Sequence, residues 1–193
     1  PMPKFTFGWT NTFRYKNFDL SVFINGSYGN NVYNYLSMKL THMNSPWTNQ
    51  LNAVNGRAQL VPINPNKVYE DGTMWYNDVS NVMVANPGAS IPRATINDPN
   101  DNDRISDRYI EDGSYIRLKN ISLGYTFPKK TIDKLGLSNL RIYANIQNLL
   151  TITGYDGYDP EIGASTSSVN VYGLDNGRYP SPTVYSFGLN VSF

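Results

Sequence analysis

Hydrophobic and polar residues alternate with a period of two in five stretches of this 193-residue chain. In the first stretch, about residues 4–15, one parity is mostly aromatic and the other is small or polar. A period of two is typical of a β-strand with one apolar face. The alternation restarts at about residues 18–27, directly after Lys16-Asn17, so the two stretches predict a β-hairpin. The aromatic parity of the first stretch comprises Phe5, Phe7, Trp9, Phe13 and Tyr15.

The other three predicted strands span about residues 114–127, 140–147 and 183–193. The first of them changes parity in its middle, and a β-bulge near Lys119-Asn120 restores the phase, because one extra residue turns every later side chain to the opposite face. The last strand alternates down to the final residue. Its apolar parity, which we interpret as lipid-facing and as a barrel-assembly signal, comprises Tyr185, Phe187, Leu189, Val191 and Phe193.

The connections between these strands alternate between short and long. Residues 16–17 and 128–139 form the short connections, whereas residues 28–113 and 148–182 form long loops. Outer-membrane barrels alternate in this way, with short periplasmic turns and long outer loops, and their tilted strands need about ten residues to cross a bilayer. We therefore expect an all-β fold of antiparallel transmembrane strands, with Phe193 at the periplasmic rim.

Five strands are too few to close a membrane barrel, since the smallest have about eight. An open edge in hydrocarbon leaves backbone groups unpaired. We therefore expect residues 1–193 to be either part of a larger barrel or one chain of an assembly, and the start at Pro1, without a signal peptide, to mark a mature product or an excerpt. A soluble sheet would need a covering layer, which no pattern here predicts. Short helical stretches are expected only at about residues 32–43 and 128–136.

Composition and charge narrow the possible chemistry. The 16 basic and 15 acidic residues give a net charge of +1, which disfavours a basic nucleic-acid groove. There is no cysteine, which excludes disulfides and thiolate chemistry, and the single histidine, His42, excludes a multi-histidine metal cluster. No run approaches 18 apolar residues, so no transmembrane helix is expected.

Four stretches resemble one known family, the SusC/RagA-like TonB-dependent transporters of outer membranes. They lie in the family's order and end at its terminal aromatic residue. They are PKFTFGWTNTFRYKNFDLSVFINGSYGNNVYN at 3–34, NDNDRISDRYIEDGSYIRLKNISLGYTFP at 100–128, NLRIYANIQNLLTITGYDGYDPEIG at 139–163 and YPSPTVYSFGLNVSF at 179–193.

The resemblance implies that residues 1–193 are the C-terminal part of a plugged barrel of about 22 strands in the bacterial outer membrane. It also implies import of oligomeric nutrients, either glycans or peptides, with energy relayed by TonB through an N-terminal part not present here. A SusD-like surface lipoprotein would act as a lid, and barrel-insertion machinery would recognise the terminal aromatic residue. No enzyme activity, cofactor or nucleic acid is implied. Two alternatives stay open: a structural barrel subunit without transport, and a soluble carbohydrate-binding module.

Aromatic and polar residues in the two long loops are the candidate substrate-binding residues. Aromatic rings stack on sugar faces, and carboxylates or arginines hydrogen-bond to hydroxyls. The same residues also suit packing of loop against loop or against the lid protein, which long ordered loops require. The candidates are Trp75, Tyr76, Tyr155, Asp156, Tyr158, Asp159, Arg178 and Tyr179.

An acidic run at residues 98–112 suggests calcium, since hard cations bind several carboxylates. The EF-hand pattern fails, however, because Asp103 stands where glycine is needed and Tyr109 where glutamate is needed. Asx turns in a solvated loop are the favoured interpretation, with Arg104, Arg108 and Arg117 offsetting the charge. His42 is expected at the surface, and no motif predicts a catalytic site or a metal site.

Overall fold

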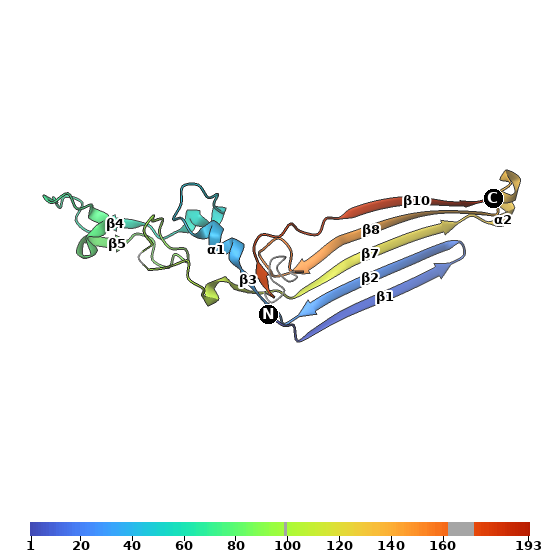
Figure 1. Cartoon of the computed structure of the whole chain (residues 1–193), viewed down its shortest axis with the longest axis horizontal. Coiled ribbons are helices and arrows are strands. Elements are labelled where there is room, and N and C mark those ends of the chain that lie inside the picture. The colour runs from blue at the N-terminus through green and yellow to red at the C-terminus, as the bar shows by residue number, and fades with distance from the viewer. Residues whose placement is uncertain (99, 162–171) are drawn as a thin grey trace. The chain divides into compact units, whose positions relative to one another are not determined.

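Five long strands form one antiparallel sheet in the computed structural model, which describes residues 1–98, 100–161 and 172–193. Their order in the sheet is β1-β2-β7-β8-β10, so each strand pairs with the next of the five along the chain (Figure 1). The expected all-β antiparallel class is confirmed. The strands are β1 Phe5–Tyr15, β2 Phe18–Tyr28, β7 Tyr115–Thr126, β8 Asn139–Thr153 and β10 Val184–Ser192.

A two-residue turn joins β1 to β2, as the alternation predicts. Tyr15 pairs with Phe18, and Lys16 adopts a positive φ of 52°. Tight hairpin turns favour positive φ because it matches the right-handed twist of the flanking strands. The hairpin is therefore stabilised both by the backbone geometry of its turn and by the pairing of Tyr15 with Phe18.

The predicted bulge lies at Lys119. Phe23 of β2 pairs with Asn120 and Ile24 pairs with Leu118, so Lys119 has no partner on β2. On the other side, Leu118 pairs with Leu150 and Asn120 with Gln147, which shifts the β7–β8 register at the same place. The bulge thus restores the phase of β7 against both neighbours.

Strand β8 is longer than predicted. We expected this strand to end at Gln147 and an outer loop to begin at residue 148, but pairing with β7 continues to Thr153. Asn148, which has a positive φ of 53°, is a polar residue at a position where the alternation needs an apolar one, so the sequence pattern ends there. The connection to β10 therefore begins at residue 154, and its residues 162–171 lie outside the described residues.

The register gives the sheet one apolar face and one polar face. Direct partners across all five strands share a face, and Trp9, Ile24, Leu118, Leu150 and Phe187 all belong to the apolar one. This face is not covered within the chain, since Trp9, Leu150 and Phe187 are 53%, 53% and 82% exposed. The opposite face is mainly polar, with threonine, serine, asparagine and arginine beside a few aromatic residues such as Phe23 and Tyr143. The uncovered face of the sheet is thus the apolar one, whereas a soluble protein covers that face.

Two glycines let long side chains lie flat on the polar face. A Cβ on Gly124 would fall 2.3 Å from the Arg141 guanidinium, and one on Gly188 would fall 2.2 Å from the Tyr143 ring. The space above Gly124 allows Arg141 Nη2 of β8 to donate to Asp19 Oδ2 of β2 at 2.6 Å across the intervening strand. This ion pair ties three strands together on one face.

The short connections and the C-terminus gather at one end of the sheet (Figure 1). Between β7 and β8 lie α2 Lys129–Ile132 and a 3-10 turn at Asp133–Leu135, which ends at Gly136 with φ 69°. The expected helical stretch at residues 128–136 is thus confirmed. Ser138 donates its N–H to the carbonyl of Ser192, which fixes the final strand beside this link.

A small second sheet lies at the opposite end of the strands. It consists of β3 Asn31–Asn34 between β6 Ile110–Asp112 and β9 Leu174–Asp175, with β3 and β9 parallel. Val32 and Asp175 are almost fully buried here. This sheet brings the two long connections together within the unit formed by residues 1–34 and 110–193.

Residues 35–109 form a separate compact unit. The unit contains α1 Tyr35–Thr41 and a two-stranded sheet of β4 Leu60–Pro62 with β5 Val82–Val84. The helix expected at 32–43 is therefore shorter than predicted, because residues 31–34 are paired as β3. Short 3-10 turns occupy Asn52–Gly56, Trp75–Asn77, Val79–Asn81 and Asp107–Tyr109.

Within the described ranges, no helix combines the length and apolar character needed to cross a membrane.

Candidate functional site

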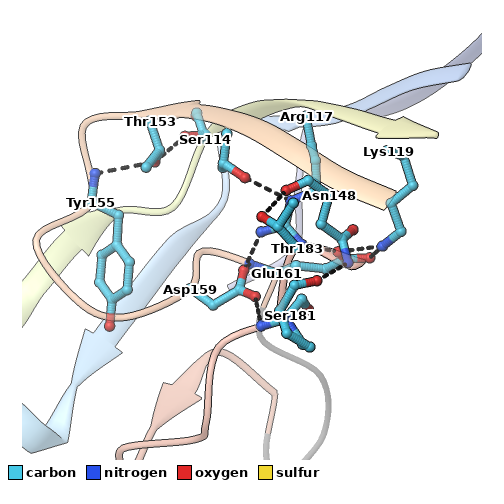
Figure 2. A network of polar contacts seen from close by, with 12 residues as sticks. Ser114, Arg117, Lys119, Asn148, Thr153, Tyr155, Asp159, Glu161, Ser181 and Thr183 are labelled. Carbon is cyan, nitrogen blue, oxygen red and sulfur yellow. Dashed lines mark hydrogen bonds and ion pairs between the residues drawn. The ribbon is translucent and has the colours of Figure 1, made fainter. Parts of the chain in front are cut away.

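A buried arginine organises the polar face of the sheet where β7 meets the chain that follows β8. Arg117 of β7 is 2% exposed and forms ion pairs with Asp159 and, through Nη1 at 2.6 Å, with Glu161 Oε2 (Figure 2). Its Nε donates to Thr151 Oγ1 at 2.9 Å. Lys119, the bulged residue, donates to the same Glu161 carboxylate at 2.7 Å. The bulge thus places a second cation, the Lys119 ammonium group, at the cluster.

Asp159 is the central acceptor of this cluster. One carboxylate oxygen accepts from Arg117 and from the Glu161 N–H at 2.9 Å, and the other accepts from the Ser181 N–H at 2.9 Å (Figure 2). Partial burial raises the pKa of Asp159, but hydrogen bonds from Ser181, Arg117 and Glu161 outweigh burial and hold this pKa below its usual value. Asp159 therefore stays ionised and joins both ends of the 154–182 connection to β7.

A second buried contact fixes the same connection. Tyr155 is 6% exposed and its hydroxyl donates to Asp175, which is 2% exposed. Asp175 also accepts from the Gly177 N–H at 2.9 Å. Burial, followed by the hydrogen bond to the Asp175 carboxylate, raises the pKa of Tyr155, so the phenol stays a donor.

Three of the predicted substrate-binding residues line one groove of about 630 Å³: Asp159, Arg178 and Tyr179. Lys119, Glu161 and Ser181 line it as well. Tyr179 is 84% exposed and presents its ring without cover. The groove therefore combines opposite charges, a hydroxyl and an open aromatic ring, which suits a polar ligand.

The other predicted residues lie outside this groove. Tyr155 is buried against Asp175, whereas the Asp156 N–H donates to Glu111 and Tyr158 is 62% exposed. Trp75 and Tyr76 belong to the separate unit of residues 35–109, where their rings meet edge to face at 5.7 Å. The substrate-binding role of all eight residues remains a prediction.

One residue of the acidic run, Asp112, accepts hydrogen bonds in a turn. Asp112 accepts from the Ser114 N–H at 2.9 Å and from its hydroxyl, which confirms the Asx-turn prediction there and lowers the pKa of Asp112. The expectation that nearby arginines offset the run is wrong. Arg117 pairs instead with Asp159 and Glu161, while Arg104 donates to the Asn100 carbonyl and Arg108 stacks on the Tyr109 ring.

His42 is not at the surface, contrary to expectation. The ring is 9% exposed, and Nε2 lies 3.0 Å from Asp98 Oδ2. Asp103 lies 3.8 Å from Nδ1, so one histidine and two carboxylates gather in a geometry that could hold a cation. Asp98 also accepts from the backbone and side chain of Asn102, however, which satisfies its oxygens without an ion.

Sequence patterns missed the residues that organise the site, namely Arg117, Lys119, Glu161 and Asp175. The parity of Arg117 was a partial signal: it places the cation on the polar face, but a carboxylate partner is needed only if folding buries the cation. The partners lie more than 40 positions away, at Asp159 and Glu161, where only folding brings them into reach.

Comparison with known proteins finds no matching family model. Among curated proteins, the chain is 35% identical over its whole length to TonB-dependent receptor P3 of Formosa agariphila and 32% identical to TonB-dependent receptor P26 of the same organism. It is also 29% identical, over 96% of its length, to TonB-dependent receptor SusC of Bacteroides thetaiotaomicron. The chain belongs to the SusC/RagA-like TonB-dependent receptors.

Solved structures of the SusC/RagA-like group share the fold of this chain. The RagAB peptide transporter matches 99% of it with a TM-score of 0.69 at 22% identity. The RagAB peptide importer in its closed-closed state matches all of it with a TM-score of 0.65 at 20% identity. The present SusC/RagA-like chain spans about 17% of the length of these relatives, so it is the counterpart of one part of a much larger protein.

Proposed function

We propose that this chain is the C-terminal part of the barrel wall of an outer-membrane TonB-dependent importer for oligomeric nutrients. In this arrangement the apolar face of the five-stranded sheet contacts lipid and the polar face lines the lumen. Arg117, Lys119, Asp159 and Glu161 then belong to the lumen side, where they fix the connection between β8 and β10 over the wall.

The observation that carries the proposal is the separation of a mainly apolar face from a mainly polar face. Direct partners from β1 to β10 place Phe7, Ile121 and Phe187 on one face and Thr10, Ser122 and Ser186 on the other. Lipid solvates an apolar face, whereas water left against it would cost about 25 cal/mol for each Å². An outward apolar band and a polar interior are the two surfaces of a membrane barrel.

The strand edges support a larger barrel. β1 pairs only with β2 and β10 pairs only with β8 in the described part of the chain. Both edges need partners in hydrocarbon, where an unpaired backbone group costs several kcal/mol. Strands elsewhere in the full-length protein supply these partners in the proposed arrangement.

The proposed transport involves the long connections as well as the wall. The nutrient is an oligosaccharide or a peptide, a SusD-like lipoprotein covers the outer mouth, and TonB acts through the N-terminal part of the protein. The exposed Tyr158, Arg178 and Tyr179 and the Trp75–Tyr76 pair are the side chains we assign to ligand contact. Such aromatic and charged groups on ordered loops are typical of ligand sites.

Deletion of the full-length gene in the source bacterium tests this function. We expect loss of growth on one class of oligosaccharide or peptide, restored by the wild-type gene. A tagged full-length protein, purified from outer membranes, is expected to bring a surface lipoprotein with it. Unchanged uptake of every oligosaccharide and peptide tested, with the barrel still assembled, would instead identify a structural subunit without transport of its own.

A further inference from the structure

A second groove, of about 890 Å³, lies entirely within the unit of residues 35–109. Three segments line it, namely residues 57–60, 75–77 and 93–97. Arg57 bridges to Ile91 in a parallel arrangement, and the Ala58 N–H donates to the Ile91 carbonyl at 2.8 Å. These backbone contacts hold the first and third segments side by side, so the groove has a fixed wall.

Two arginines line this groove without a counter-charge. Among the residues that the structure describes, neither Arg57 nor Arg93 has a carboxylate within 4.0 Å. Arg57 Nη1 makes one weak contact, donating to the Val54 carbonyl at 3.3 Å. Both residues are half-buried. A half-buried guanidinium with no carboxylate partner favours binding of an external anion.

Two acidic residues of the same unit, Asp98 and Asp78, are committed to other partners. Asp98 accepts from His42 and Asn102, and Asp78 accepts from Lys67, Tyr69 and Ser80. The hydrogen bonds from Lys67, Ser80 and Tyr69 hold the pKa of Asp78 below its usual value, so this carboxylate stays ionised. No acidic side chain lines the groove, which leaves its net charge positive.

The remaining lining residues suit a sugar ring. Trp75 and Tyr76 supply aromatic surface, and Gln59, Asn77 and Asn97 supply amide donors and acceptors. A saccharide presents an apolar ring face beside several hydroxyls, and each hydroxyl needs its own partner once it leaves water. A groove with aromatic rings and several amides therefore suits a saccharide, which has many hydroxyls, better than a peptide side chain, which has few polar groups.

We propose that this groove binds an anionic saccharide, with Arg57 and Arg93 pairing with a carboxylate or sulfate group and the Trp75–Tyr76 pair contacting the ring. The proposal rests on the importer function above and narrows its substrate to acidic glycans. Guanidinium groups bind planar or tetrahedral oxyanions through two parallel hydrogen bonds, which gives them selectivity over neutral sugars.

The test uses the detergent-purified full-length protein and an array of matched glycans. Each uronate oligosaccharide is paired with its methyl ester, and each sulfated oligosaccharide with its desulfated form. We expect binding of at least one anionic member and loss of binding to its neutral partner. Arg93→Gln is expected to weaken that binding about tenfold or more, since it removes a charge-assisted contact. Raised salt concentration should weaken it as well.

Two further variants separate charge from folding. Arg57→Lys keeps the charge while it removes the planar fork, and is expected to retain more affinity than Arg57→Gln. Arg104→Gln removes a positive charge from the same unit outside the groove and is expected to bind as the wild type does. Equal losses for Arg93→Gln and Arg104→Gln would overturn the proposal.

Other outcomes are equally decisive. Binding of neutral glycans or acidic peptides only would contradict the anionic-saccharide assignment. Failure to bind any anionic glycan would contradict it as well. If the deletion strain still fails to take up a neutral glycan or a peptide, the importer function stands while this assignment fails. If the deletion strain has no uptake defect, the importer function itself fails, whatever the array shows.

Discussion

Arg117 and Asp159 are 42 positions apart in the chain and form an ion pair that joins β7 to the connection after β8. The side chains are 3% and 11% exposed, so water screens the pair only weakly. A pair at this depth is costly to break from one side, because the remaining charge stays behind without its partner. The first prediction follows from this asymmetry.

Arg117→Met should open the 154–161 segment in the full-length protein. Loss of the guanidinium leaves Asp159 and Glu161 without their main counter-charge, which is expected to cost about 3 kcal/mol of local stability. Hydrogen–deuterium exchange of residues 154–161 measures the change. Arg178→Met, at an exposed arginine of the same connection, is the control and should leave exchange unchanged. Equal protection in both variants would refute the structural role of Arg117.

The same segment should respond to acid in one direction only. The folded-state pKa of Asp159 lies below the value of 3.8 expected for an unfolded chain. The stabilisation is therefore fully present above that value and is lost as the pH falls through the lower, folded-state pKa. We expect constant protection of residues 154–161 from neutral pH down to about pH 4 and a decline below it. Asp159→Asn should remove this acid-dependent step, and a step that persists in this variant would assign it to another group.

Tyr155→Phe should destabilise the same connection at a second point. The substitution removes the hydroxyl that donates to the buried Asp175 and keeps the ring, so the expected cost is about 1–3 kcal/mol for an under-satisfied acceptor. Limited proteolysis of the full-length protein within residues 172–182 reports the effect. Tyr158→Phe removes an equivalent hydroxyl from a ring that is 62% exposed and should change nothing. Similar cleavage rates for the two variants would count against a role for the buried hydrogen bond.

The two faces of β10 should meet different solvents in the intact protein. Ser186 and Phe187 are neighbours that point to opposite faces of the sheet. A nitroxide attached at Phe187→Cys should be relaxed mainly by oxygen, which concentrates in lipid, and one at Ser186→Cys mainly by a water-soluble nickel complex. Electron paramagnetic resonance in liposomes measures both accessibilities. The reverse pattern, or equal access at both sites, would exclude the proposed lipid-facing assignment.

The terminal strand should also govern membrane insertion. Phe187 and Phe193 belong to the apolar parity of the last predicted strand, and Phe193 is 93% exposed. We expect the double substitution Phe187→Ala with Phe193→Ala to reduce the amount of heat-modifiable barrel in the outer membrane several-fold, because it removes aromatic surface presented to lipid and to the insertion machinery. Ser186→Ala with Ser192→Ala, on the polar parity, is the matched control. An unchanged amount of heat-modifiable barrel in the phenylalanine variant would contradict this prediction.

The sheet was predictable because its signal is local. Most apolar residues of β1 and β10 are two positions from the next, and a strand places such residues on one face whatever it pairs with. The bulge at Lys119 was readable for the same reason, since a change of parity within one strand needs an extra residue. The end of β8 was not readable, because polar Asn148 stands at a position of the apolar parity and breaks the alternation, and only pairing with β7 shows that the strand continues.

The sequence predicted some residues of the candidate sites from their chemical type, but it did not predict which residues they contact. Sequence alone selected Asp159 and Arg178 for their chemistry, yet it assigned Arg117 to the acidic run and placed His42 at the surface. Both errors concern contacts over long sequence separations, the Arg117–Glu161 ion pair and the His42–Asp98 hydrogen bond. Such pairs depend on which loops fold against each other, and no local pattern encodes that.

The sequence by itself determined the class of the fold, the two faces of the sheet and the family resemblance, because alternation and motifs are properties of neighbouring residues. Only the tertiary structure decided which polar residues hold the long connections in place and which remain open to a ligand. Tyr155 and Tyr179 look alike as loop aromatics, but the first is buried on Asp175 and the second is 84% exposed. That difference arises from burial, which depends on contacts between segments far apart in the chain.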